Sequence, residues 1–127
     1  MTGFIGNIEE QVLANTSFRK VIFTGKYGQV VLMSLLPSEE IGMEVHETVD
    51  QFFRIDSGEG KVIMNGEEAT FSDGFAFVVP AGTNHNIINT SSENPLKLYT
   101  IYMPANHPDG KEHKTKAEAM ADENDHV

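Results

Sequence analysis

The chain has 127 residues, of which 39% are hydrophobic and 11 are glycine, a composition typical of one globular domain. Its formal net charge of −10 argues against nucleic acid and anionic membrane surfaces as partners, because both are bound through clustered lysine and arginine. The absence of cysteine excludes disulfides and Cys-ligated metal sites, so a metal here would be held by histidine, carboxylate, amide or water.

The N-terminal residues lack the basic stretch and the apolar core of a signal peptide. No apolar run approaches the ~20 residues that a membrane-spanning helix needs. We therefore expect a soluble, cytoplasmic protein.

Taken in order, most of the chain has the pattern of short strands separated by turns. Residues 1–15 fit either a short helix capped by Asn7 or an edge strand. Asn65-Gly66 is the strongest hairpin signal. We expect strands over residues 18–24, 29–36, 50–55, 61–64, 67–71, 74–79, 85–89 and 96–103, with a short extended piece over 42–46. Turn signals at this regular spacing favour an all-β sandwich or barrel.

The C-terminal end has a different pattern. Thr115 is a suitable cap for a short helix rich in alanine. We divide the chain into an N-terminal arm (1–17), a barrel (18–104) and a C-terminal tail (105–127). His107, His113 and His126 fall in the tail, where no strand fixes them, and we expect them to be exposed to solvent.

Two histidines and one carboxylate fall where strand geometry can bring them together. Glu44 and His46 share one face because side chains alternate along a strand. A turn over residues 47–49 would bring Gln51 to the same face, and His85 begins a further inward row. This donor set is that of non-haem iron(II) enzymes, and it also suits zinc, manganese, nickel or cobalt.

The same residues carry a resemblance to a known family. The chain resembles the small, single-domain cupins of the sugar-isomerase-like (mannose-6-phosphate-isomerase-like) group. The second cupin motif is matched in full, by Gly74, Pro80, Gly82, His85 and Asn89. The first is matched in part, by His46, Gln51 and Gly58. The resemblance implies a double-stranded β-helix, or jelly-roll, barrel that holds a divalent metal through Glu44, His46, Gln51 and His85.

Three positions depart from the first motif, at Ser38, Glu44 and Gln51. Glu44 stands where a histidine is usual, and Ser38 stands where a glycine is usual. Glu44 keeps a ligand and adds a negative charge, which compensates for the charge lost where Gln51 replaces a glutamate. The alternative is a family member that has lost its metal, with His46 and His85 hydrogen-bonded in a polar barrel mouth.

Neighbouring residues receive more ordinary roles. Asp50 is expected to anchor a loop. Arg54 is expected to form a salt bridge with Asp50 or Asp56 on the outer face, or an oligomer contact, rather than to bind substrate. Tyr99 and Tyr102 have opposite parity, and we favour Tyr102 as the one that faces the cavity. The aromatic residues expected in the core are Phe53, Phe75 and Phe77. Either Asn84 or Asn86 is expected to orient His85.

Two classes of function remain open. The first is a metal-dependent enzyme for a small polar molecule, either a sugar or uronate isomerase or a dioxygenase, with Glu44 or Tyr102 as the group that moves a proton. The second is a non-catalytic binding module for a small molecule, with a structural metal or none. The outward, apolar Phe52 fits a homodimer formed through the outer sheet.

Overall fold

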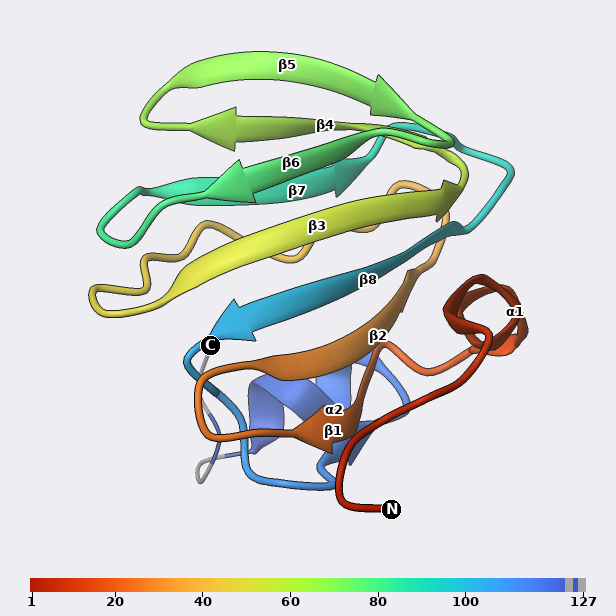
Figure 1. The fold of residues 1–127 in the computed structure, drawn as a ribbon. Coiled ribbons are helices and arrows are strands. Elements are labelled where there is room, and N and C mark those ends of the chain that lie inside the picture. Colours follow the sequence, from red (N-terminus) through yellow and green to blue (C-terminus); the bar gives the residue numbers. More distant parts are fainter. Residues whose placement is uncertain (123–124, 126–127) are drawn as a thin grey trace.

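The computed structural model describes residues 1–122 and residue 125. Its elements are α1 (Ile8–Ala14), β1 (Arg19–Thr24), β2 (Gln29–Leu35), β3 (Asp50–Ser57), β4 (Glu59–Met64), β5 (Glu67–Ser72), β6 (Ala76–Val79), β7 (His85–Asn89), β8 (Leu96–Met103), β9 (Glu112–His113) and α2 (Lys116–Ala121). The strands form two antiparallel sheets, ordered β6-β3-β8-β2-β1-β9 and β5-β4-β7 (Figure 1). This confirms an all-β fold with a short C-terminal helix.

The interior between the sheets has an apolar end and a polar end. Side chains of β3 and β8 alternate between buried and more exposed positions, so that one face of each strand lines the interior. Phe53, Ile55 and Leu98 of the large sheet pack with Val62 and Ile87 of the small sheet. At the other end of β3 and β8, Gln51 lies opposite Tyr102 and both side chains are buried. Polar groups therefore gather at this end.

Local sequence signals explain several element boundaries. The first segment is a helix, because the Asn7 side chain accepts a hydrogen bond from the Glu10 backbone N–H and caps it. Asn65 and Gly66 have φ values of 48° and 85°, as the tight hairpin turn between β4 and β5 requires. Thr115 caps α2 by accepting from the Glu118 backbone N–H. Among the described residues, no helix is long and apolar enough to cross a membrane.

The tail contradicts one prediction. His107 and His113 are each only 4% exposed, so they are not solvent-exposed side chains, and His126 lies outside the described residues. The reason is long-range pairing: β9 adds to the edge of the large sheet with His113 opposite Arg19, which folds the tail back against the barrel.

One aromatic residue is also misplaced by the sequence pattern. Phe75 is 51% exposed, whereas Phe53 lies in the core and Phe77 packs against it. Phe75 lies before β6, in a tight turn where its N–H donates to the Ser72 carbonyl. The strand alternation that buries Phe77 and Val79 therefore does not extend to Phe75.

Candidate metal centre

Glu44 and His85 are held directly opposite each other by backbone hydrogen bonds. The irregular segment before β3 runs antiparallel to β7, and the N–H of each residue donates to the carbonyl of the other at 2.9 Å. Opposite residues in an antiparallel pair present their side chains on one face. His46 lies two residues beyond Glu44 and shares that face. The predicted convergence of Glu44, His46 and His85 therefore follows from strand pairing.

The three side chains meet inside the barrel. Glu44 Oε1 lies 3.4 Å from His46 Nε2 and 3.5 Å from His85 Nε2. One ligand atom from each residue falls within a group spanning no more than 4.8 Å. Their exposed fractions are 9%, 7% and 1% for Glu44, His46 and His85. The arrangement has the size and burial of a metal site.

The turn after β6 fixes the His85 ring. Gly82 has a φ of 79°, which glycine adopts without strain, and its N–H donates to the His46 carbonyl. The carbonyl of Thr83 lies 2.9 Å from His85 Nδ1 and accepts its proton. Nε2 is then the nitrogen that faces Glu44.

The predicted role of the flanking asparagines is therefore wrong. The Asn86 side chain accepts from the Gly42 N–H and donates to Glu40, and Asn84 is held through its own N–H by Asn65. The Asn86 bonds brace the segment that carries Glu44, and the Asn84 bond ties the start of β7 to the turn between β4 and β5. Neither set of bonds reaches the His85 ring. A backbone carbonyl performs the task, and side-chain chemistry in the sequence gives no sign of it.

Gln51 approaches from the large sheet. The turn after His46 places it on the inward face of β3, as expected, and it is almost fully buried. Its Nε2 donates to Thr100 Oγ1 at 3.0 Å, which fixes the amide plane. Its oxygen has no hydrogen-bond partner in the part of the chain that the structure describes.

Unsatisfied acceptors give the chemical character of the centre. Among the described residues, four buried polar atoms here have no partner that meets hydrogen-bond geometry: Glu44 Oε2, His46 Nε2, Gln51 Oε1 and His85 Nε2. The two imidazole nitrogens lie only within ion-pair range of Glu44 Oε1. Burying such a group without a partner costs roughly 1–3 kcal/mol. A cation bound among them would satisfy all four, and the donor set fits a divalent metal.

The charges of the centre are coupled. Burial would raise the pKa of the Glu44 carboxyl, but the neighbouring imidazoles of His46 and His85 outweigh burial and hold the pKa at about 2. Burial lowers the pKa of His85, and its contacts with Glu44 and the Thr83 carbonyl raise it overall. The Glu44 carboxylate and the His85 imidazole therefore each favour the charged form of the other.

Comparison with known proteins agrees with this geometry. A family model described as the cupin domain matches residues 31–102, more than half of the chain. The chain belongs to the cupin family. It is 50% identical to the uncharacterized protein YrkC of Bacillus subtilis, over 94% of this chain and 67% of YrkC. It is 43% identical to the uncharacterized protein L612 of Acanthamoeba polyphaga mimivirus, over 85% of this chain and 69% of L612.

A solved structure supports the same assignment. The crystal structure of BH2720 from Bacillus halodurans superposes with a TM-score of 0.91 and 45% identity, and the match covers 94% of each chain. The similarity extends beyond residues 31–102 and so includes parts of the arm and tail that pack on the cupin barrel.

Tyr102 faces the interior of the cupin barrel, as expected. It is buried, and its ring meets the His46 ring edge-on, with centroids 5.8 Å apart. Burial raises the pKa of its phenol, which is therefore protonated at neutral pH. Its hydroxyl lies 3.1 Å from His107 Nε2. The contact of His107 with Tyr102 could not be predicted from the sequence, because no strand pattern surrounds His107.

The two surface predictions near the centre are confirmed. Asp50 accepts a hydrogen bond from the Ala81 N–H at 2.8 Å and so anchors the turn that leads to His85. Arg54 Nε lies 3.7 Å from Asp56 Oδ1, which makes Asp56 its partner.

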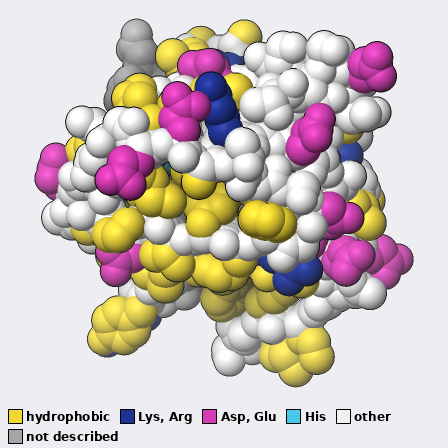
Figure 2. Space-filling model, turned by 90° about the horizontal axis from the view of Figure 1, so that it is seen from above, with side chains coloured by type: hydrophobic (Ala, Val, Ile, Leu, Met, Phe, Trp, Pro, Cys, Tyr) yellow, Lys and Arg dark blue, Asp and Glu magenta, His cyan; other side chains and the backbone are white. Residues whose placement is uncertain are grey.

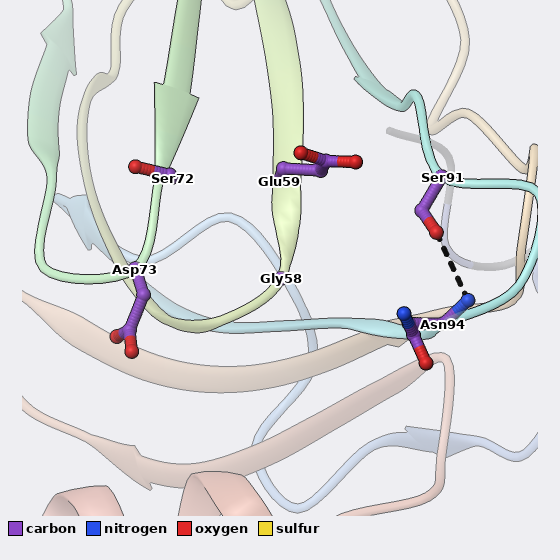
Figure 3. Close-up of a pocket in the computed structure, with 6 residues that line it drawn as sticks. All are labelled: Gly58, Glu59, Ser72, Asp73, Ser91 and Asn94. Atoms are coloured by element: carbon purple, nitrogen blue, oxygen red, sulfur yellow. Dashed lines mark hydrogen bonds between the residues drawn. The ribbon is translucent and has the colours of Figure 1, made fainter.

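A surface hollow lies away from the candidate centre. It has a volume of about 320 Å³ and is lined by Gly58, Glu59, Ser72, Asp73, Ser91 and Asn94 (Figure 3). Met64 lies opposite His85 at one end of β4, and Glu59 is at the other end, roughly 17 Å away at the rise of an extended strand. Two exposed carboxylates and short polar side chains line it, so it has none of the chemistry of the candidate centre.

Proposed function

We propose that this cupin binds one divalent metal ion through Glu44, His46, Gln51 and His85 and acts on a small polar molecule. The observation that carries the proposal is the set of four buried, unpartnered atoms that these residues contribute. Two imidazoles, one carboxylate and one amide oxygen make a donor set for iron, zinc, manganese, nickel or cobalt. Six-coordinate metals in this set would keep positions open for a ligand.

The reaction would be of the isomerase or the dioxygenase type. A bound metal would supply Lewis acidity toward carbonyl and hydroxyl oxygens or, as iron(II), reactivity with dioxygen. The chain would hold the metal with its imidazoles and orient the substrate against the buried wall formed by Gln51, Thr100 and Tyr102. Glu44 and Tyr102 are the groups placed to take or give a proton there.

Metal analysis of the untagged protein tests this proposal. We expect about one metal ion per chain after purification, and loss of that metal in Glu44→Ala and His85→Ala variants. Glu47→Ala is the matched control, because Glu47 is an exposed carboxylate one residue from His46. Iron would favour oxygenase chemistry, and a redox-inactive metal would favour isomerase chemistry or a binding role.

Loss of metal in His85→Ala alone would make Glu44 a base rather than a ligand. A wild-type protein that stays empty after reconstitution with iron, zinc, manganese, nickel and cobalt would overturn the proposal. In that case the non-catalytic binding module would replace it.

The proposal also covers the localisation, the partners and the oligomeric state of the protein. We infer a cytoplasmic protein with a small-molecule ligand, no nucleic-acid partner, and a homodimer formed through the outer face of the large sheet. An apolar row crosses that face, because Val78, Phe52, Ile101 and Val30 are successive cross-strand partners. Val78 is 50% exposed, and Phe52 contacts the Tyr99 ring on the same face. Figure 2 shows hydrophobic side chains gathered in a band on one side of the molecule.

A further inference from the structure

The tail places a buried carboxylate against a buried histidine. Asp125 and His107 are each 4% exposed, and both oxygens of Asp125 lie close to His107 Nδ1, at 2.8 and 2.9 Å. The backbone of His107 is also fixed. Gln29 accepts from its N–H at 3.0 Å and donates to its carbonyl at 2.7 Å. The imidazole is therefore held at its main chain and at one ring nitrogen.

The other ring nitrogen of His107 points to the candidate centre. His107 Nε2 lies 3.1 Å from the Tyr102 hydroxyl, and the two rings meet edge-on with centroids 5.0 Å apart. Tyr102 in turn contacts the His46 ring. A continuous chain of contacts thus runs from Asp125 through His107 and Tyr102 to the candidate ligands.

The chemistry of these groups sets the direction of each hydrogen bond. A ring N–H donates and a carboxylate oxygen accepts, so the two Asp125 oxygens beside Nδ1 place the imidazole proton on that nitrogen. Burial, and then the nearby Arg19 guanidinium, lower the pKa of His107, so the ring is neutral at pH 7. A neutral ring protonated on Nδ1 has a lone pair on Nε2. The Tyr102 hydroxyl must then donate to Nε2.

We propose that Asp125 and His107 are positioning residues, which turn the Tyr102 hydroxyl hydrogen away from the candidate metal centre so that the phenol oxygen accepts a hydrogen bond there. This inference rests on the proposed function for its consequence: the ligand beside the metal would carry a donor, a hydroxyl group or a bound water molecule. Tyr102 would be the accepting member in any proton shuttle.

A metal at the tail cluster is a weaker account of these residues. His113, Asp122 and Asp125 also lie within 4.8 Å of one another through single atoms. However, Lys111 Nζ lies 2.8 Å from Asp122 Oδ2, and Arg19 contacts the ring of His113. These cations already neutralise the cluster, and both oxygens of Asp125 face His107. The cluster is therefore an ion-pair network that anchors the tail.

Long-range proton–nitrogen NMR of the ¹⁵N-histidine-labelled, metal-free protein at pH 7 tests the proposal. We expect His107 to be neutral and mostly protonated on Nδ1, the tautomer that free imidazole side chains disfavour. This wild-type spectrum decides without any variant. A His107 ring protonated mainly on Nε2, or an imidazolium, would overturn the proposal.

Variants then test whether Asp125 is the group that fixes the tautomer of His107. Asp125→Ala should move His107 mainly to the Nε2-protonated tautomer. Asp109→Ala, an exposed carboxylate of the same tail, should leave the wild-type pattern, and so should Tyr102→Phe, because Asp125 still fixes Nδ1. An unchanged tautomer in a folded Asp125→Ala protein would contradict the positioning role.

The result of this NMR test does not depend on whether the protein binds a metal. His107 and Asp125 lie outside the proposed ligand set, so Asp125→Ala should retain the wild-type metal content. Loss of metal-binding ability in the wild type would end the proposed function, yet the His107 tautomer would still report whether the positioning chain exists.

Discussion

Glu44 supplies the one formal negative charge among the four candidate ligands, and it is one of the positions at which this chain departs from the first cupin motif. Its carboxylate lies between two imidazoles and has one oxygen without a partner. Glutamine at this position would remove the charge and keep the side-chain volume. A change in metal affinity would then report the loss of a ligand rather than the loss of packing.

We expect Glu44→Gln to weaken zinc binding by at least about 100-fold, since loss of an outer-sphere partner alone costs 10–100-fold. Isothermal titration of the metal-free protein measures the affinity. Glu47→Gln is the control, because it removes an exposed charge from the same segment. Equal affinities of Glu44→Gln and wild type would show that Glu44 is not a ligand.

The pKa shifts at the centre give a pH dependence of stability. The raised pKa of His85 stabilises the metal-free protein below about pH 6.5, the ordinary value, and that contribution is lost as pH rises through the folded pKa. The lowered pKa of Glu44 stabilises it above about 4.5, and that contribution is lost as pH falls towards 2. The pair thus stabilises the metal-free fold most between these values.

A metal held by His85 would compete with protonation of its imidazole, so the stabilisation that the metal provides should grow as pH rises above about 6.5. Thermal unfolding with and without zinc at pH 5.5 and 7.5 measures this. We expect the larger rise in Tm at pH 7.5. A rise that is greater at pH 5.5 would be inconsistent with ligation by His85.

At the scale of elements, β4 and β7 approach so closely that one position needs glycine. A Cβ at Gly60 would lie 2.3 Å from the Ile88 carbonyl oxygen and 2.7 Å from the Phe71 ring. We expect Gly60→Ala to lower the free energy of unfolding by about 3 kcal/mol, because backbone must move to relieve the overlap. Gly3→Ala meets nothing within 4 Å and should change it by less than about 0.5 kcal/mol.

Denaturant titration of the two variants measures the difference. Equal midpoints for Gly60→Ala and Gly3→Ala would mean that β4 and β7 are further apart than described.

The elements that could be predicted are those whose signals are local. Strand alternation placed Glu44 and His46 on one face, and the expected turn over residues 47–49 brought Gln51 to the same face. Asn65-Gly66 fixed a hairpin. What could not be predicted depends on contacts between distant segments. His107 and Asp125 become buried because β9 pairs with β1, nearly a hundred residues earlier in the chain, and two-residue strands carry no periodicity. The hydrogen bond from His85 to the Thr83 carbonyl could not be predicted for a different reason, because every residue type carries the same backbone carbonyl.

For the whole molecule, the outer apolar row gives a test of assembly. We expect a homodimer at micromolar concentration by light scattering, and a monomer for Val78→Glu, which would place a charge at the end of the row. Thr70→Glu adds the same charge to β5 of the small sheet and should stay dimeric. A monomeric wild-type protein would contradict the proposed homodimer and would not bear on the proposed metal centre.

The central claim is that Glu44, His46, Gln51 and His85 hold one metal inside the barrel. Anomalous X-ray diffraction from crystals of the untagged, zinc-loaded protein tests it most directly. We expect one anomalous peak per chain, about 2.0–2.2 Å from an oxygen of Glu44 and from Nε2 of His46 and His85. The Gln51 oxygen should face this peak. A crystal with no peak at this position, or with its peak at His113 and Asp122 instead, would contradict the account.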